Sequence, residues 1–349
     1  MIYHATMNSG QIKENLDLKN LTTFRMGGRA RWFVAASTIE ELAQAYDFAV
    51  EKNLPVFILG SGSNILFSHP GTFEAVVVKI EIKGFEIVSE TEDEATVKVG
   101  AGEIWDDVVK RAVDMNLSGI EALSAIPGTT GATPIQNVGA YGSEIADVLV
   151  SLEVYDLQTK HLSSLSKEQC LFKYRDSIFK HDAKDKYVIT AITMKLSKGA
   201  PLVPDYPGVK KYFDERNIEH PTLQQIREAI ISIRQLKLPD PKQVASVGSF
   251  FKNPIVSGDL YQTVKENYPE VVAFPQENGE YKISAGWLLE TLGYKGKQIG
   301  NLQFYPNSAL VLTNVGNATF SELIDLVDKT KADVRQAFGI ELELEPIIV

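Results

Sequence analysis

The sequence contains almost no cysteine and no long hydrophobic run. Cys170 is the single cysteine among 349 residues, so the chain cannot form an internal disulfide and has no cysteine-based metal site. Stretches of about 18 or more apolar residues are absent, which argues against a membrane-spanning helix. The first 20 residues lack a cationic segment followed by an apolar one, so no secretory signal is predicted. These absences predict a protein of the reducing cytoplasm.

The sequence also has a deficit of positive charge. Lys and Arg number 35 against 45 Asp and Glu, which gives a formal net charge of −10. An acidic chain is poorly suited to nucleic acid or an anionic membrane, so neither is expected as a main partner. An anionic small substrate is compatible with this charge, because a local Lys/Arg cluster can reverse the potential inside one cleft.

Length and patterning predict more than one domain. A chain of 349 residues exceeds what one hydrophobic core usually serves, so two or three domains are expected. Strand and helix patterns alternate to about residue 200. The segment 201–220 is rich in Pro and Gly, which predicts a linker or lid. A second unit follows over 221–349.

Apolar periodicity and end signals predict the main elements. Helices are predicted after Thr38, over 103–116, from Thr222 to Pro239, and from Thr319 to Gly339. Strands are predicted over 30–36, 55–60, 75–80, 95–102, 149–157, 187–196 and 340–349. Capping-box spacings mark helix starts, and Gly or Pro marks helix ends.

The last predicted strand, 340–349, carries a candidate acid. Its initial alternation puts Leu342 and Leu344 on one face, and Glu341, Glu343 and Glu345 on the other. One interpretation is an edge strand with a solvated acidic face. The other is a strand that lines a cleft and presents a carboxylate.

Two glycine-rich loops could hold an anionic cofactor. "GSGSN" (60–64) follows an apolar strand, where glycines let backbone N–H groups converge on an anion. It is neither a dinucleotide fingerprint, because Ile65 occupies the third glycine position, nor a P-loop. "IPGTTGATPIQNVGAYG" (126–142) combines several glycines with Gln136 and Asn137 and has no amphipathic period. Taken together, the two loops favour a nucleotide cofactor over ordinary connections.

Two further stretches have both a structural and a catalytic interpretation. In "YRDSIFK" (174–180), Arg175 offers a planar fork of donors that suits a carboxylate or a developing oxyanion. The alternative is a structural Arg on a turn. In "SVGSFFKNP" (246–254), Ser249 points a hydroxyl into a cleft, or the stretch is a hairpin corner whose two Phe rings fill the core.

These motifs occur in one order along the chain, and together they resemble a known family. "ILGSGSNILF", "IPGTTGATPIQNVGAYG", "YRDSIFKH", "LPDPK" followed by "GSFFKNP", "SAGWLLE" and the terminal "LELEP" are similar to the UDP-N-acetylenolpyruvoylglucosamine reductases. The resemblance covers essentially the whole chain. The "YRDSIFK" motif and a Tyr-bearing loop are typical of the longer of the family's two types.

The resemblance implies a fold and a reaction. The expected fold is α+β: an FAD-binding domain of the vanillyl-alcohol-oxidase type over 1–200, with two subdomains split near 70–85, then a linker or lid over 201–220. A C-terminal α+β substrate-binding domain follows over 221–349. The implied enzyme is an oxidoreductase that uses NADPH and FAD to reduce UDP-N-acetylglucosamine enolpyruvate to UDP-N-acetylmuramate. That step belongs to peptidoglycan synthesis in the bacterial cytoplasm, and so to cell-wall biogenesis, cell shape and cell division.

The resemblance also implies roles for individual residues. Ser249 would protonate the substrate carbon, while Arg175 and a protonated Glu345 would stabilise the negative charge that builds up on the substrate; Glu345 matches the terminal motif better than Glu343. Substrate binding falls to Tyr174, Tyr206, Lys237, Lys252 and Asn253. Noncovalent FAD binding falls to Gly60, Ser61, Gly62, Ser63, Asn64, Pro127, Gly128, Gly131, Gln136, Asn137, Gly139, Ala140, Tyr141 and Gly142. The expected state is a monomer without metal.

Two other functions remain open on the sequence. A flavin oxidase on the same scaffold would lack the Ser–Arg–Glu set and would consume oxygen with an alcohol or sugar. A regulator that binds a nucleotide sugar without turnover would purify as a colourless protein. Flavin absorbance and oxygen consumption therefore separate the three interpretations.

Overall fold

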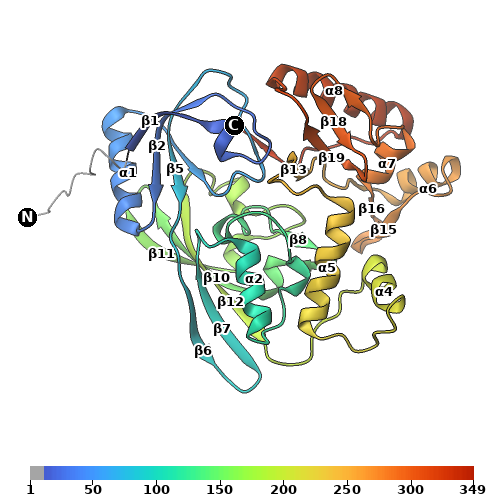
Figure 1. Cartoon of the computed structure of the whole chain (residues 1–349), viewed down its shortest axis with the longest axis horizontal. Helices are drawn as coiled ribbons and strands as arrows, with labels where there is room; N and C mark the ends of the chain where they lie inside the picture. The colour runs from blue at the N-terminus through green and yellow to red at the C-terminus, as the bar shows by residue number, and fades with distance from the viewer. Residues whose placement is uncertain (1–11) are drawn as a thin grey trace, which may run out of the picture. The chain divides into compact units, whose positions relative to one another are not determined.

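The structure is a computed structural model that describes residues 12–349 (Figure 1). Residues 1–11, which begin the segment examined for a secretory signal, lie outside the described part. Two compact units are present. Unit 1 contains the described residues up to Leu16 together with Ala30–Ser61 and Phe73–Arg234, and unit 2 contains Asp17–Arg29, Gly62–Thr72 and Gln235–Val349. Within the described part, every helix is too short or too polar to cross a membrane.

The first sheet of unit 1 has four strands in the order β1-β2-β5-β3. They are β1 (Ile12–Asp17), β2 (Arg29–Ala36), β5 (Thr72–Ile80) and β3 (Val56–Leu59). Helix α1 (Ile39–Lys52) connects β2 to β3, and β3 pairs in parallel with β5. The Thr38 hydroxyl accepts a hydrogen bond from the Glu41 N–H at 3.2 Å, so the predicted capping residue begins this helix.

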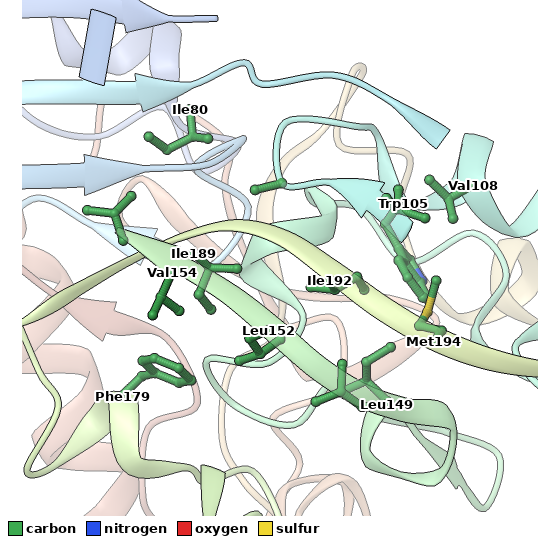
Figure 2. Close-up of a cluster of buried hydrophobic side chains, with 14 of the residues drawn as sticks. Ile80, Trp105, Val108, Leu149, Leu152, Val154, Phe179, Ile189, Ile192 and Met194 are labelled. Carbon is green, nitrogen blue, oxygen red and sulfur yellow. The ribbon is translucent and has the colours of Figure 1, made fainter. Parts of the chain in front are cut away.

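The second sheet of unit 1 is antiparallel and has the order β11-β10-β12-β7-β6. Its strands are β6 (Phe85–Glu90), β7 (Glu94–Gly100), β10 (Leu149–Asp156), β11 (His161–Ser166) and β12 (Tyr187–Ser197). Helix α2 (Trp105–Asp114) packs its apolar face on this sheet. Figure 2 shows Trp105 of α2 beside Met194 and Ile192 of β12. The buried indole N–H of Trp105 donates to the Leu123 carbonyl at 3.1 Å, so this buried donor has a hydrogen-bond partner.

Two further helices of unit 1 pack on one another. They are α4 (Pro207–Asp214) and α5 (Leu223–Lys237), seen in yellow in Figure 1. Val209 and Phe213 of α4 lie buried against the isoleucines of α5. The segment expected to be a linker therefore contains a packed helix. The predicted boundaries at residues 200 and 220 stay a prediction, while the compact units divide within α5, after Arg234.

Unit 2 has three α-helices and two small antiparallel sheets, besides a two-stranded parallel pair described below. One sheet has the order β13-β19-β18-β17 and the other the order β14-β16-β15. The strands are β13 (Ala245–Ser249), β14 (Ile255–Val256), β15 (Ala273–Pro275), β16 (Tyr281–Ile283), β17 (Gln298–Ile299), β18 (Leu302–Tyr305) and β19 (Ser308–Asn314). The helices are α6 (Gly258–Asn267), α7 (Ala285–Thr291) and α8 (Phe320–Phe338). Phe24 and Leu66, from the N-terminal segments of this unit, join the same core.

The strand predicted over 340–349 is wrong for most of its length. Only Ile347–Ile348 form a strand, β20, which pairs in parallel with β4 (Ile65–Leu66). Leu344 makes a single bridge to Phe251. Pro346 separates the two contacts, because a proline has no N–H to donate to a ladder.

Candidate active site

The first glycine-rich loop, 60–64, approaches the second one closely. A Cβ atom on Gly60 would lie 2.6 Å from Thr129 Oγ1, so glycine is required at this position. The Ser61 hydroxyl is buried and lacks a hydrogen-bond partner among the described residues. Buried polar atoms are nearly always paired in proteins, so this hydroxyl fits a donor to a ligand that the loop holds.

The second loop, 126–142, is fastened to unit 1 through its backbone. The Gly128 carbonyl accepts from the Trp105 N–H at 3.1 Å, and the Gly131 N–H donates to the Ala101 carbonyl at 2.8 Å. A Cβ atom on Gly131 would lie 2.6 Å from the Cβ of Ala101. Glycine therefore serves close backbone approach here, as the cofactor-loop interpretation requires.

Asn137 of this loop has its amide occupied within the protein. Its Nδ2 donates to Glu144 Oε2 at 2.6 Å and to the Lys173 carbonyl at 3.2 Å, and its Oδ1 accepts from the Ala146 N–H at 3.2 Å. The side chain is buried. We conclude that Asn137 shapes the loop, while its predicted contact with FAD stays a prediction together with those of the other loop residues.

Arg175 lies on a tight turn that other side chains hold in place. Its φ of 53° is in the left-handed region, which is costly for a residue with a Cβ. Its Nη2 donates to the Gly139 carbonyl at 2.7 Å, so the guanidinium contacts the second glycine loop. Lys180 Nζ donates to the Arg175 carbonyl at 3.1 Å, and the Ser177 hydroxyl donates to the Ile135 carbonyl at 2.6 Å. The guanidinium also lies 5.3 Å from the ring centroid of Tyr174, the preceding residue.

The other side of this turn carries a hydrogen-bonded His–Asp pair that sequence reasoning did not single out. His181 Nε2 lies 2.8 Å from both carboxylate oxygens of Asp176. Burial works to raise the pKa of Asp176, but its contacts with His181, the Ser177 N–H and the charge of Lys180 together lower the pKa below its ordinary value. The pair braces the turn next to Arg175.

Tyr141 and Tyr206, which were assigned to different ligands, lie together. Their rings meet edge to face with centroids 5.2 Å apart. Burial raises the pKa of the Tyr141 hydroxyl, against the opposing effect of Arg234, which hydrogen-bonds to it. Tyr206 precedes α4, so the predicted lid contacts the end of the second glycine loop.

Three charged residues near this loop were missed from the sequence. Arg227 forms a two-point ion pair with Asp106, at 2.6 and 2.9 Å, and Arg234 Nε donates to the Ala125 carbonyl at 3.3 Å. A signal was present, because the two arginines are seven residues apart and so share the apolar face of α5 with its isoleucines. Charged residues on the buried face of a helix indicate hydrogen-bonding partners on the segments packed against that face.

In unit 2, Ser249 ends strand β13 at an irregularity of the ladder. It pairs with Val311, and the register shifts between Ser246 and Ser249. Gly248 has φ 76°, and a Cβ there would meet no atom within 4 Å. Gly248 is therefore favoured by its left-handed backbone conformation, and no neighbouring atom is close enough to exclude a side chain there. Bulges of this kind redirect the following side chain.

The two Phe residues at this corner lie in the core, as the hairpin-corner interpretation expected. Phe250 and Phe251 are 1% and 2% exposed, and their rings lie 5.3 Å apart. The Phe250 N–H donates to the Leu310 carbonyl at 2.8 Å. The rings thus fill the core and fix the turn behind the half-buried Ser249.

The two candidate acids differ in environment. Glu343 is 74% exposed and pairs with Lys252 at 2.9 Å. Glu345 is half-buried, and its N–H donates to the Phe250 carbonyl at 3.1 Å. Its own carbonyl accepts from Asn64 Nδ2 at 3.3 Å. Unit 2 therefore places Glu345 beside the Ser249 corner and the first glycine loop.

The remaining predicted substrate contacts are dispersed over unit 2. Lys252 is engaged by Glu343, as described above, and Asn253 Oδ1 accepts from the Ala285 N–H at 2.9 Å. Lys237 is exposed at the last position of α5. The single cysteine, Cys170, is buried, and burial raises the pKa of its thiol to about 11, so it is not a nucleophile of this site.

Two family models match separate parts of the chain. Residues 30–163 match the FAD binding domain, and residues 240–349 match the C-terminal domain of UDP-N-acetylenolpyruvoylglucosamine reductase. Together the two matches contain both glycine loops, Ser249 and Glu345. They support the α+β fold class with a flavin domain that was expected from the sequence.

Whole-length relatives and a solved structure agree with these matches. The chain is 39% identical over 340 residues to a UDP-N-acetylenolpyruvoylglucosamine reductase of Flavobacterium johnsoniae, covering 97% of this chain and 100% of that protein. It is 40% identical to a protein of the same name from Pseudomonas syringae, covering 96% and 98%. The crystal structure of the Thermus caldophilus reductase matches with a TM-score of 0.67 at 23% identity, covering 97% and 99%. That structure supports the fold.

Proposed function

This chain belongs to the UDP-N-acetylenolpyruvoylglucosamine reductase family, and we propose that Ser249, Arg175 and Glu345 carry its chemistry. It is an FAD-dependent oxidoreductase that reduces UDP-N-acetylglucosamine enolpyruvate at the expense of NADPH, in peptidoglycan precursor synthesis. The observation that carries this conclusion is the identity of 39–40% over 96–97% of the chain. The two family models, one on each part, are consistent with it.

The two glycine loops fit an FAD. The flavin, when bound, supplies the hydride chemistry between NADPH and the enolpyruvyl group. Gly60 and Gly131 allow backbone contacts that a Cβ would block, and the buried Ser61 hydroxyl has no partner among the described residues. We assign FAD to the loop residues 60–64 and 127–142 named above, and we expect the binding to be noncovalent.

Arg175 is proposed to bind the substrate carboxylate. Hydride addition to the terminal carbon of an enol ether moves negative charge onto the neighbouring carbon and its carboxylate. A planar guanidinium can hold that charge with two parallel hydrogen bonds. The braced turn supports this role, because a positioned cation needs no reorganisation as the charge develops.

Glu345 is proposed as the second donor to this charge. A carboxyl group donates a hydrogen bond only when protonated, and burial beside an anion favours that state. The half-buried position of Glu345 supports this assignment over Glu343, whose carboxylate is exposed and paired with Lys252.

Ser249 is proposed to protonate the carbon next to the carboxylate. A hydroxyl at a bulge, backed by two buried rings, is held in one orientation, and this supports protonation from one face. Tyr174, Tyr206, Lys237, Lys252 and Asn253 are proposed to bind the rest of the anionic nucleotide. For Lys252 this requires exchange of its ion pair with Glu343.

We further propose the predicted organisation and setting of the protein. The flavin domain spans 1–200 in two subdomains split near 70–85, with the lid over 201–220 and the substrate domain over 221–349. The protein is proposed to act as a monomer in the cytoplasm, in support of cell-wall biogenesis, cell shape and cell division, without nucleic acid or membrane. Light scattering on the purified protein tests the monomer.

One experiment tests the function directly. The purified protein should be yellow, and NADPH consumption should rise when UDP-N-acetylglucosamine enolpyruvate is added. The product should be UDP-N-acetylmuramate, identified by its mass. A yellow protein that ignores this substrate and consumes oxygen with an alcohol or sugar is a flavin oxidase. A colourless protein that binds the nucleotide without turnover is a regulator.

A further inference from the structure

Arg234 contacts both ends of the second glycine loop, 126–142. Its Nε donates to the carbonyl of Ala125, the residue that precedes the loop, at 3.3 Å. Its side chain also hydrogen-bonds the hydroxyl of Tyr141, the second-to-last residue of the loop. One side chain of α5 therefore joins two points that lie sixteen residues apart in sequence.

Both of these points are strained. Ala125 has φ 57° and Tyr141 has φ 53°, and neither is a glycine. Residues with a Cβ avoid this left-handed region, because the Cβ crowds the following carbonyl oxygen. Such conformations persist only where the surroundings over-determine them, and they cluster at ligand sites.

The Ala125 end is fixed from both sides. Its carbonyl accepts from Arg234, and its N–H donates to Asp106 Oδ1 at 2.6 Å. The same carboxylate forms the two-point ion pair with Arg227. Arg227 lies seven residues, or about two helical turns, before Arg234 on α5. Helix α5 thus carries two arginines that act, directly and through Asp106, on the entrance of the loop.

The Tyr141 end leads to the lid. The ring of Tyr141 meets the ring of Tyr206 edge to face, and Tyr206 directly precedes α4. Both rings pack against the cluster that α4 forms with α5. Arg234 therefore reaches the exit of the loop at the point where the lid segment contacts it.

We propose that Arg234 is a positioning residue that clasps the two ends of the glycine loop and so preforms the FAD site. This rests on the proposed function, in which the loop 126–142 holds FAD. Without the clasp, Ala125 and Tyr141 relax out of their left-handed conformations. FAD binding then has to restore them, and its affinity falls by about tenfold for each residue that relaxes.

The test compares the wild-type holoenzyme with three variant holoenzymes by dilution, with the fluorescence of released FAD as the readout. On dilution, Arg234→Gln should begin to release FAD at protein concentrations ten- to a hundredfold higher than those at which the wild type does. Arg234→Lys should behave similarly, because a lysine keeps the charge but not the fork of donors. The control is Arg111→Gln, which removes an exposed arginine of α2 in the same unit and should leave release unchanged.

A rescue separates the clasp from a general loss of structure. Glycine adopts φ 57° without strain, so Ala125→Gly in the Arg234→Gln background should recover about five- to tenfold in FAD affinity. A general loss of folding would not respond to this substitution. Absence of rescue, with unchanged circular dichroism of both variants, overturns the clasp.

The remaining outcomes are also decisive. Release from Arg234→Gln within twofold of the wild type overturns the proposal while leaving the enzyme's function intact. Wild-type release by Arg234→Lys overturns it too, because charge alone would then suffice. A wild-type protein that binds no FAD refutes the proposed function and removes the premise of the clasp.

Discussion

The sharpest prediction concerns the two acids of the terminal segment. We compare Glu345→Gln with Glu343→Gln, two substitutions of one type that lie two residues apart. Glutamine keeps the shape of the side chain and one donor, but it cannot titrate. Because the two glutamates differ in burial, the structure predicts different consequences for the same chemical change.

The expected magnitudes follow from the two environments. Glu343 is 74% exposed, so its ion pair with Lys252 lies at the protein surface. Such pairs contribute about 1 kcal/mol or less, so Glu343→Gln should change turnover by no more than roughly fivefold. Glu345 is half-buried beside the Ser249 corner. Loss of a positioned acid typically reduces kcat by about 10²–10⁴-fold, and Glu345→Gln should do so.

The assay is NADPH consumption at saturating enolpyruvyl substrate, measured as kcat against pH. Glu345→Gln should flatten one limb of the profile, because the titrating group has been removed. Glu343→Gln should keep the limb of the wild type. Both proteins should retain FAD absorbance, which controls for folding. An inactive Glu343 variant beside an active Glu345 variant would show that the acid had been assigned two residues out of register.

Three other substitutions test the remaining assignments. Ser249→Ala should keep FAD, and NADPH should still bleach it, while kcat falls by about 10²–10⁴-fold; stopped-flow absorbance separates the two half-reactions, and normal turnover would remove Ser249 from the mechanism. Arg175→Lys should raise KM and lower kcat together, because the fork serves bound substrate and transition state alike; full activity in steady-state assays would exclude two-point recognition. Asp106→Asn should cost about 3 kcal/mol of unfolding free energy, because it leaves the buried Arg227 without its carboxylate. Burial works to raise the pKa of Asp106, but the hydrogen bonds from Arg227 and Ala125 and the charges of Arg227 and Arg234 together lower it. The contribution of Asp106 to stability is therefore present above the unfolded pKa and is lost as pH falls through the folded pKa. Urea unfolding at neutral and acidic pH should show the acid-dependent loss in the wild type but not in the variant.

Local signals predicted the elements that carry strong periodicity. Helix α8 begins at the predicted Thr319 cap and ends at Gly339, and α5 ends before Pro239, because caps and breakers act over a few residues. The interior strands of unit 1 were found for the same reason, since their apolar runs are continuous. The terminal strand was predicted wrongly, because the alternation of side chains persists over residues whose backbone makes few ladder bonds.

The chemistry-bearing residues were recognisable as residue types within motifs. Glycine loops, an Arg on a polar turn and a Ser beside two Phe each have a short-range reason, and their shared order resembled one family. The supporting residues carried no such motif. Arg227 and Asp106 lie 121 residues apart in sequence, and Arg234 and Ala125 lie 109 residues apart.

The sequence by itself therefore determined the family and the cofactor class, and it predicted which residues face the chemistry. The tertiary structure decided how those residues are held. It placed Glu345 against the Phe250 backbone and left Glu343 in solvent, a difference that two acids in one alternating segment do not reveal. It also joined Ala125 and Tyr141 through Arg234. Such contacts depend on which surfaces meet when distant segments pack, and the pattern of one segment does not identify its partner.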